Sequence, residues 1–203
     1  MRKQSNISFV DLAFCLVFGF VLLFTVAVIQ FNIKSKEAEI KKPNAEFLIV
    51  LTWQGNINQD VDLWIRDPNG TLTFFKALEN GITHLDRDDL GHMNDKYTDR
   101  DGVEHIIPIN QEIGTIRGFL TGEWVINVHL YKCDKQKKPA NCQITMTKLN
   151  PKSSIVFSRD LTLTNYWEEQ TVAVVMMDGN GKIIDVEKDL LVKLVESEIR
   201  RNL

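Results

Sequence analysis

Aspartate side chains are dense in two neighbouring stretches of the sequence. One lies between His84 and His105, and the other lies shortly before it. Carboxylate oxygens are the ligands that Ca²⁺ prefers, although the EF-hand spacing is not met. The candidate ligands are Asp60, Asp62, Asp67, Asp86, Asp88 and Asp89. The alternative is a salt-bridged or solvated loop without metal, because Arg66 and Arg87 could neutralise these acids.

Other chemistry-bearing patterns are missing from the sequence. The four histidines show no zinc-type spacing, and there is no Cys-x-x-Cys pair. Neither a nucleophile elbow, nor a phosphate-binding loop, nor a dinucleotide fingerprint is present. We therefore predict that the chain is not an enzyme. The net charge of −3 likewise gives no basic patch for nucleic acid.

Two cysteines, Cys133 and Cys142, lie in a polar stretch between two predicted strands. A hairpin at this position would bring their Cβ atoms within bridging distance. We expect a disulfide between them if the domain lies in an oxidising compartment.

A membrane-spanning helix is the strongest element in the sequence. Residues Leu12 to Ile29 carry no charge, and a helix of this length spans roughly 27 Å, close to the thickness of the bilayer core. No small-residue cleavage site follows Ile29, so a retained anchor is favoured over a signal peptide. We expect a tail at 1–8, a transmembrane helix at 9–31 and a linker at 32–45.

Asp11 opens this apolar segment. A carboxylate there costs a few kcal/mol unless it meets water, a partner or a proton, which would suit an ion-binding residue. The simpler interpretation is a helix cap, because Ser8-Phe9-Val10-Asp11 matches the S-x-x-D capping pattern. Spacing alone does not separate the two interpretations.

The start of the helix, Asn6-Ile7-Ser8-Phe9-Val10-Asp11-Leu12, resembles that of the ExbD/TolR family and of the related MotB and ZorB subunits. The resemblance covers about 25 residues and lacks a Pro common before the Phe in ExbD. It implies that Asp11 binds H⁺ or Na⁺, with Ser8 and Thr25 as further polar positions in the ion path. It also implies that two copies sit inside a pentameric ring of a multi-span MotA/ExbB-like partner. The OmpA-like wall-binding domain of MotB is absent.

The remainder, 46–203, has the pattern of a β-sandwich. Strands are expected at 46–53, 61–66, 72–75, 104–109, 123–131, 142–149, 154–163, 168–177 and 182–186, because apolar residues alternate there. Asp67-Pro68-Asn69-Gly70 predicts a hairpin turn. Leucines on one face predict a terminal helix at Lys188–Arg201.

The run from Gly55 to Gly70 resembles the D-x-D-L-x-[VI]-x-D-P-x-G signature of YfaP-like β domains. This resemblance spans about 80 residues and implies a fold rather than an activity.

Two functions are therefore expected from the sequence. The first is a B subunit of a proton- or sodium-driven rotary complex with five ring subunits and two B subunits, which acts on an envelope target. The second is a membrane-tethered binding module for glycan or protein, with or without Ca²⁺. In both cases we expect a single-pass protein of the bacterial inner membrane, with a cytoplasmic N-terminus and a periplasmic domain. The charges that flank the helix do not argue against this orientation, because long domains translocate largely regardless of flanking charge.

Overall fold

The computed structural model describes residues 4–37, 44–55, 57–91, 95–133 and 138–201. The chain divides into two compact units, Met1–Pro43 and Asn44–Leu203. Each unit is described by itself below. Part of the predicted linker, 38–43, lies outside the described residues.

Helix α1, Gln4–Glu37, is 34 residues long and is the only long helix among the described residues. Its segment Phe9–Ile29 is long and apolar enough to cross a membrane, and none of it is buried against the rest of the chain. Apart from Asp11 this segment has no charged residue on any side, as expected for a helix surrounded by lipid or by other membrane helices. It extends past both ends of the predicted span of 9–31.

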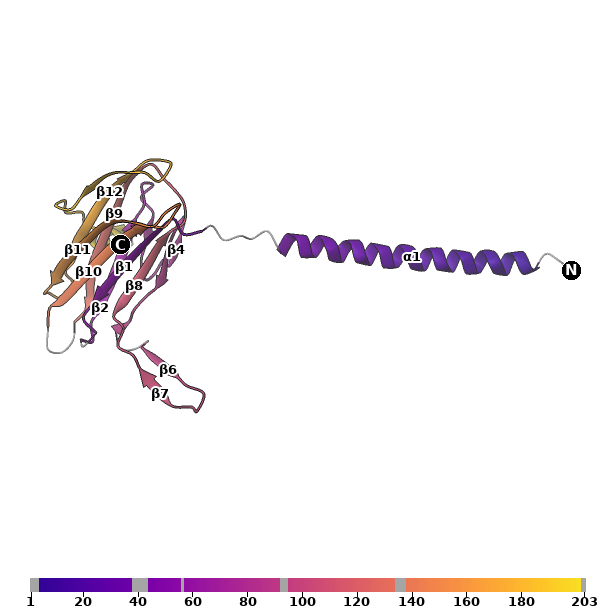
Figure 1. Ribbon diagram of the computed structural model, residues 1–203, viewed down its shortest axis with the longest axis horizontal. Helices are drawn as coiled ribbons and strands as arrows, with labels where there is room; N and C mark the ends of the chain where they lie inside the picture. Colours follow the sequence, from indigo (N-terminus) through magenta and orange to yellow (C-terminus); the bar gives the residue numbers. More distant parts are fainter. Residues whose placement is uncertain (1–3, 38–43, 56, 92–94, 134–137, 202–203) are drawn as a thin grey trace. The chain divides into compact units, whose positions relative to one another are not determined.

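The second unit is mostly β and is built from two large antiparallel sheets (Figure 1). The six-stranded sheet has the order β11 (Ser154–Leu163), β10 (Ala140–Lys148), β1 (Phe47–Trp53), β8 (Gln111–Ile116), β5 (Thr83–Arg87), β4 (Glu79–Asn80). The five-stranded sheet has the order β13 (Ile183–Glu187), β12 (Glu169–Met177), β9 (Gly122–Lys132), β2 (Asp60–Arg66), β3 (Leu72–Thr73). A separate hairpin pairs β6 (Lys96–Thr98) with β7 (Glu104–Ile106).

Alternating side chains of both sheets form one hydrophobic core. Phe47, Ile49 and Leu51 of β1 and Val61 and Leu63 of β2 all belong to the same buried cluster. Because side chains alternate across a strand, the intervening residues of β2 point to the opposite face of their sheet. The core therefore draws one face from each sheet.

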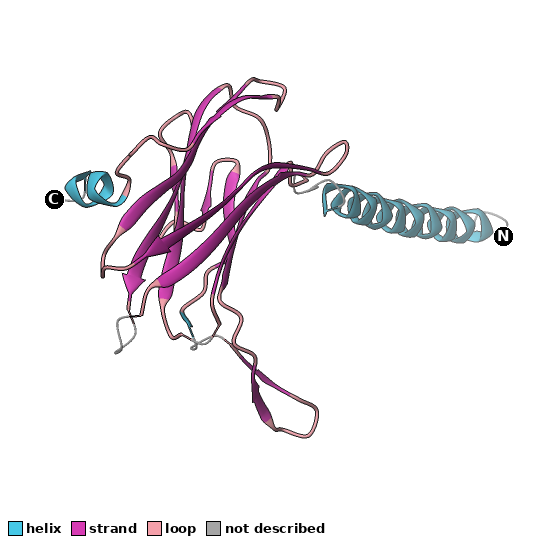
Figure 2. Cartoon of the chain, turned by 60° about the vertical axis from the view of Figure 1, so that its left-hand side comes forward, coloured by secondary structure: helices cyan, strands magenta, loops and turns pink. Residues whose placement is uncertain are grey.

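A second, smaller cluster covers the opposite face of the five-stranded sheet. It joins Trp64 of β2 and Val174 of β12 to Leu194 and Val195 near the C-terminus. Helix α2, Val195–Arg201, closes this face (Figure 2).

The predicted terminal helix at Lys188–Arg201 begins too early. The structure has α2 only from Val195, because the preceding backbone is bonded to the sheet. The Val192 amide donates to Thr171 Oγ1 at 2.9 Å, and its carbonyl accepts from Asn127 Nδ2 at 2.6 Å. These bonds hold the segment before the helix in a non-helical conformation.

Most predicted strands are present, but the acidic region differs from the prediction. The turn at 67–70 joins β2 to β3, as expected. The predicted strand at 104–109 is wrong in extent, since it ends at Ile106 and lies in the separate hairpin. Three strands of the six-stranded sheet, β4, β5 and β8, were not predicted.

Candidate functional site

Three carboxyl groups converge at the open edge of β2, where it meets β8. Asp62 on β2, Asp88 just after β5 and Glu112 on β8 each place one oxygen within 4.8 Å of the others. Asp62 and Glu112 are buried, and Asp88 is partly buried. We refer to these three residues, with Asp60 on β2, as the carboxylate cluster.

Glu112 is positioned by the inward face of β8. It is fully buried, and its Oε2 accepts the backbone amide of Leu63 at 2.6 Å. That amide lies on the edge of β2 that β3 does not cover, because β3 pairs only with Ile65 and Arg66. Glu112 therefore joins the two sheets by completing the hydrogen bonding of an open strand edge.

Asp62 is held from the neighbouring strand. His129 stands opposite Asp62 in the register of β9 and β2. Its Nδ1 lies 3.2 Å from Asp62 Oδ2. Both side chains are almost completely buried.

The environment of the cluster favours neutral carboxyl groups. Burial raises the pKa of Glu112 well above its ordinary value, and the nearby Asp62 charge raises it further. Burial also raises the pKa of Asp62, although the hydrogen bond from His129 lowers it. Burial raises the pKa of Asp88, and its hydrogen bond with Glu112 opposes this rise while raising the pKa of Glu112.

Asp60 extends the cluster along β2. Burial, followed by the charges of Asp62, Asp88 and Asp89, raises its pKa from 3.8 to about 7. Its Oδ1 is buried and has no hydrogen-bond partner among the described residues. A buried, unpartnered carboxylate oxygen is costly, so this side chain lacks a charge or a donor that would stabilise it.

The other predicted ligands have structural partners elsewhere. Asp67 Oδ1 accepts the amides of Asn69 and Thr71 within its turn. Asp86 pairs with Arg117 at 2.6 Å. Asp89 adjoins the cluster, but it is bonded to Arg87 and to two backbone amides.

The structure therefore brings together Asp60, Asp62 and Asp88 from the predicted set and adds Glu112, which sequence reasoning missed. The one indication in the sequence is that Glu112 alternates along its strand with Gly114 and Ile116, which face the core. That signal needed β8 to be recognised first.

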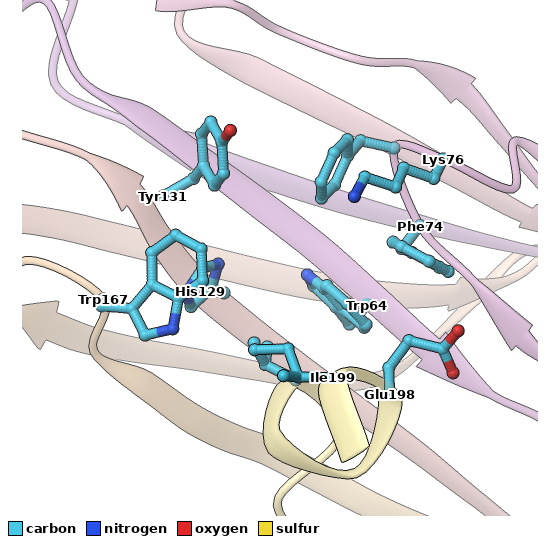
Figure 3. A pocket seen from close by; sticks show the side chains of 10 residues that line it. Trp64, Phe74, Lys76, His129, Tyr131, Trp167, Glu198 and Ile199 are labelled. Atoms are coloured by element: carbon cyan, nitrogen blue, oxygen red, sulfur yellow. The ribbon is translucent and has the colours of Figure 1, made fainter. Parts of the chain in front are cut away.

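An aromatic pocket lies on the face of the five-stranded sheet that points away from the main core, the face to which Trp64 and His129 belong (Figure 3). Its hollow has a volume of about 330 Å³. The residues around it are Trp64, Phe74, Phe75, Lys76, His129, Tyr131, Trp167, Val195, Glu198 and Ile199. This size and apolar character are typical of small-molecule sites.

His129 connects the pocket to the carboxylate cluster. Its ring lines the pocket, while its Nδ1 faces Asp62. The Trp167 indole stands edge-on to the imidazole, with ring centroids 4.6 Å apart. Trp167 adopts a φ of 67°, an unfavourable conformation for a bulky residue, so packing must hold it in place.

The predicted ion-path residues all lie on α1. Asp11 is exposed and is the sole charged residue of Phe9–Ile29. The Thr25 hydroxyl donates to the carbonyl of Val21 at 2.7 Å, one turn earlier. Ser8 lies in the helix, and its side chain is outside the described ones.

The predicted Cys133–Cys142 disulfide is not formed in this structure, where Cys142 is a buried thiol. Burial raises the pKa of Cys142 to about 12. The predicted hairpin between these residues is wrong, because β9 and β10 belong to different sheets. The segment crosses from one sheet to the other, so a bridge here would join the two sheets.

Comparisons with known protein families, with curated proteins and with solved structures find no match to this chain.

Proposed function

We propose that this chain is the B subunit of an ion-driven rotary complex in the bacterial inner membrane. Two copies of α1 stand inside a pentameric ring of a multi-span MotA/ExbB-like partner. Asp11 binds and releases H⁺ or Na⁺ there. The β domain, a β-sandwich in the periplasm, transmits the resulting motion to an envelope target.

The observation that carries this proposal is the position of Asp11. It is the one carboxylate in an otherwise uncharged segment of 21 residues. No side chain of the described chain covers that segment. A carboxylate at such a site needs water, a counter-charge or a proton from another molecule. A ring of membrane helices around α1 supplies that environment, and passage of the ion past Asp11 supplies the work.

Two further features of the chain agree with the proposal. The span is exposed on every side, so it offers a complete surface to a surrounding partner. The shared core of the two sheets supports a rigid sandwich at the other end of the chain. A rigid domain can transmit motion without first deforming.

Copurification followed by particle imaging tests this proposal. The full-length chain is expressed with a multi-span MotA/ExbB-like protein of the same genome and extracted in detergent. We expect five ring subunits around two copies of the α1 helix. A chain that purifies without any multi-span protein, or as a lone helix, would overturn the rotary function.

The aromatic pocket favours a second candidate function, a membrane-tethered binding module. Aromatic walls with Lys76 and Glu198 among the lining residues would suit a glycan or an aromatic side chain of a protein. In that case α1 is only an anchor. Asp11→Asn separates the two functions, because it abolishes activity in a motor and leaves a tether nearly unchanged.

A further inference from the structure

We propose that the carboxylate cluster of Asp60, Asp62, Asp88 and Glu112 binds one divalent cation of the Ca²⁺ class at the open edge of β2. This site lies in the β domain and is independent of Asp11. The proposal does not depend on whether the chain is a motor subunit or a membrane-tethered binding module.

The first argument is convergence. Oxygens of Asp62, Asp88 and Glu112 lie within 4.8 Å of one another. Oxygen ligands of Ca²⁺ lie roughly 2.3–2.6 Å from the ion, so three oxygens this close together can share one ion. They come from β2, from the segment after β5 and from β8, so the ion would link elements of both sheets.

The second argument is charge. The four carboxyl groups would carry four negative charges in a mostly buried region. The basic side chains beside them are His129, next to Asp62, and Lys132, near Asp60. Arg87, the nearest arginine in the sequence, is occupied by Asp89 and Asp95. Buried charges are normally paired or coordinate metals, so the cluster must either take up protons or bind a cation.

The third argument is the orphan oxygen of Asp60. Asp60 is only 7 % exposed, and its Oδ1 has no hydrogen-bond partner among the described residues. Burial, followed by the charges of Asp62 and Asp88, raises the pKa of Asp60, so its carboxyl group lies near theirs. The unpartnered oxygen of Asp60 is a separate observation from the convergence of the other three carboxyl groups.

The chemistry of the donors selects the ion class. All four donors are hard carboxylate oxygens, which suit Ca²⁺ better than softer metals. The site is enclosed, with Asp62 and Glu112 nearly inaccessible to solvent. Mg²⁺ gives up its bound water reluctantly, whereas Ca²⁺ accepts a set of protein oxygens.

Calcium binding by the full-length protein in detergent tests the site. After removal of divalent ions with EDTA, CaCl₂ or MgCl₂ is added, and binding is followed by calorimetry and thermal unfolding. We expect one Ca²⁺ per chain and an increase in unfolding midpoint of about 5 °C at saturation. Binding near pH 7 should also release protons, which makes the measured heat depend on the buffer.

The informative variant is Asp60→Asn, because it removes a charge without removing a hydrogen bond from Oδ1. Without calcium, it should unfold at a higher temperature than wild type at pH 8, since the repulsion from Asp62 and Asp88 is relieved. With calcium, its affinity should fall about tenfold or more. Asp101→Asn, on an exposed turn of the β6–β7 hairpin, is the control and should match wild type.

Two results would overturn the proposal. One is an absence of saturable calcium binding together with identical midpoints in CaCl₂ and EDTA, which would show that protons alone neutralise the cluster. The other is full calcium stabilisation of Asp60→Asn, which would place the ion elsewhere. Preference for Mg²⁺ over Ca²⁺ would overturn the assigned ion class.

Discussion

At the scale of single residues, the acidic side chains of the β domain differ in whether they have partners. Asp67, Asp86 and Asp89 each accept hydrogen bonds or pair with arginine. Asp60 has a buried oxygen that accepts none among the described residues. Partnered acids stabilise local structure, whereas an orphan acid lowers stability whenever it ionises.

The pH dependence of stability follows from this difference. The pKa of Asp60 rises from 3.8 to about 7 on folding. Between those values the folded chain binds more protons than the unfolded chain, so stability should fall as pH rises. The acids with lowered pKa values, Asp99, Glu168 and Asp178, add little slope above about pH 6, because they are ionised there in both the folded and the unfolded chain.

Urea unfolding in EDTA, from about pH 5 to about pH 8, measures this slope. Asp60→Asn should have a shallower decline than wild type. An identical decline in the two proteins would show that Asp60 does not take up a proton on folding.

The candidate cluster could be predicted from the sequence only in part. The D-x-D spacing places Asp60 and Asp62 on one face of a strand, which the period of two predicts. Nothing local indicates that Glu112, 50 positions further along the chain, meets Asp62. That contact depends on sheet topology, so it could not be read from spacing.

At the scale of elements, Glu169 organises the covered face of the five-stranded sheet. Its Oε1 accepts from Asn127 Nδ2 at 2.6 Å and from the amides of Leu194 and Val195 at 2.7 and 3.2 Å. The last two bonds occupy amides at the start of α2. One carboxylate therefore holds the C-terminal helix against β9 and β12.

Glu169→Gln should weaken this arrangement by about 1–3 kcal/mol, because a charged acceptor of three hydrogen bonds is replaced by a neutral one. Thermal unfolding measures the loss, which should amount to several degrees. Glu187→Gln is the control, since Glu187 also accepts backbone amides but is exposed. A control that is equally destabilised would show that burial of Glu169 is unimportant.

Gly114 limits the distance between the two sheets. A Cβ atom at this position would lie 2.8 Å from Ile65 Cδ1 and 3.2 Å from Leu63 Cδ2. Gly114→Ala should therefore destabilise the domain by about 1–3 kcal/mol through overpacking. Gly118→Ala, where the nearest atom would be 3.4 Å away, should be milder in the same unfolding assay. Equal losses would contradict close packing at Gly114.

Elements with strong alternation were predictable, and elements rich in polar residues were not. Val61, Leu63 and Ile65 give β2 a clear period of two. Strand β5, with the sequence Thr-His-Leu-Asp-Arg, has few apolar residues and resembles a loop. Its strand conformation comes from pairing with β8, a long-range interaction that overrides local preference.

At the scale of the whole molecule, an apolar helix and a mostly-β domain form separate compact units. The helix contributes one carboxylate, and the domain contributes a carboxylate cluster and an aromatic pocket. In the proposed complex, the helix takes energy from the ion gradient, and the domain conveys it to a target.

Ion flux through the reconstituted complex tests the central claim, that Asp11 carries the transported ion, most directly. Vesicles holding the full-length chain and its ring partner are given a proton or sodium gradient, and uptake is recorded. Wild type and Asp101→Asn should conduct, whereas Asp11→Asn should lose nearly all uptake although the complex still assembles. Unchanged uptake in Asp11→Asn would contradict the account.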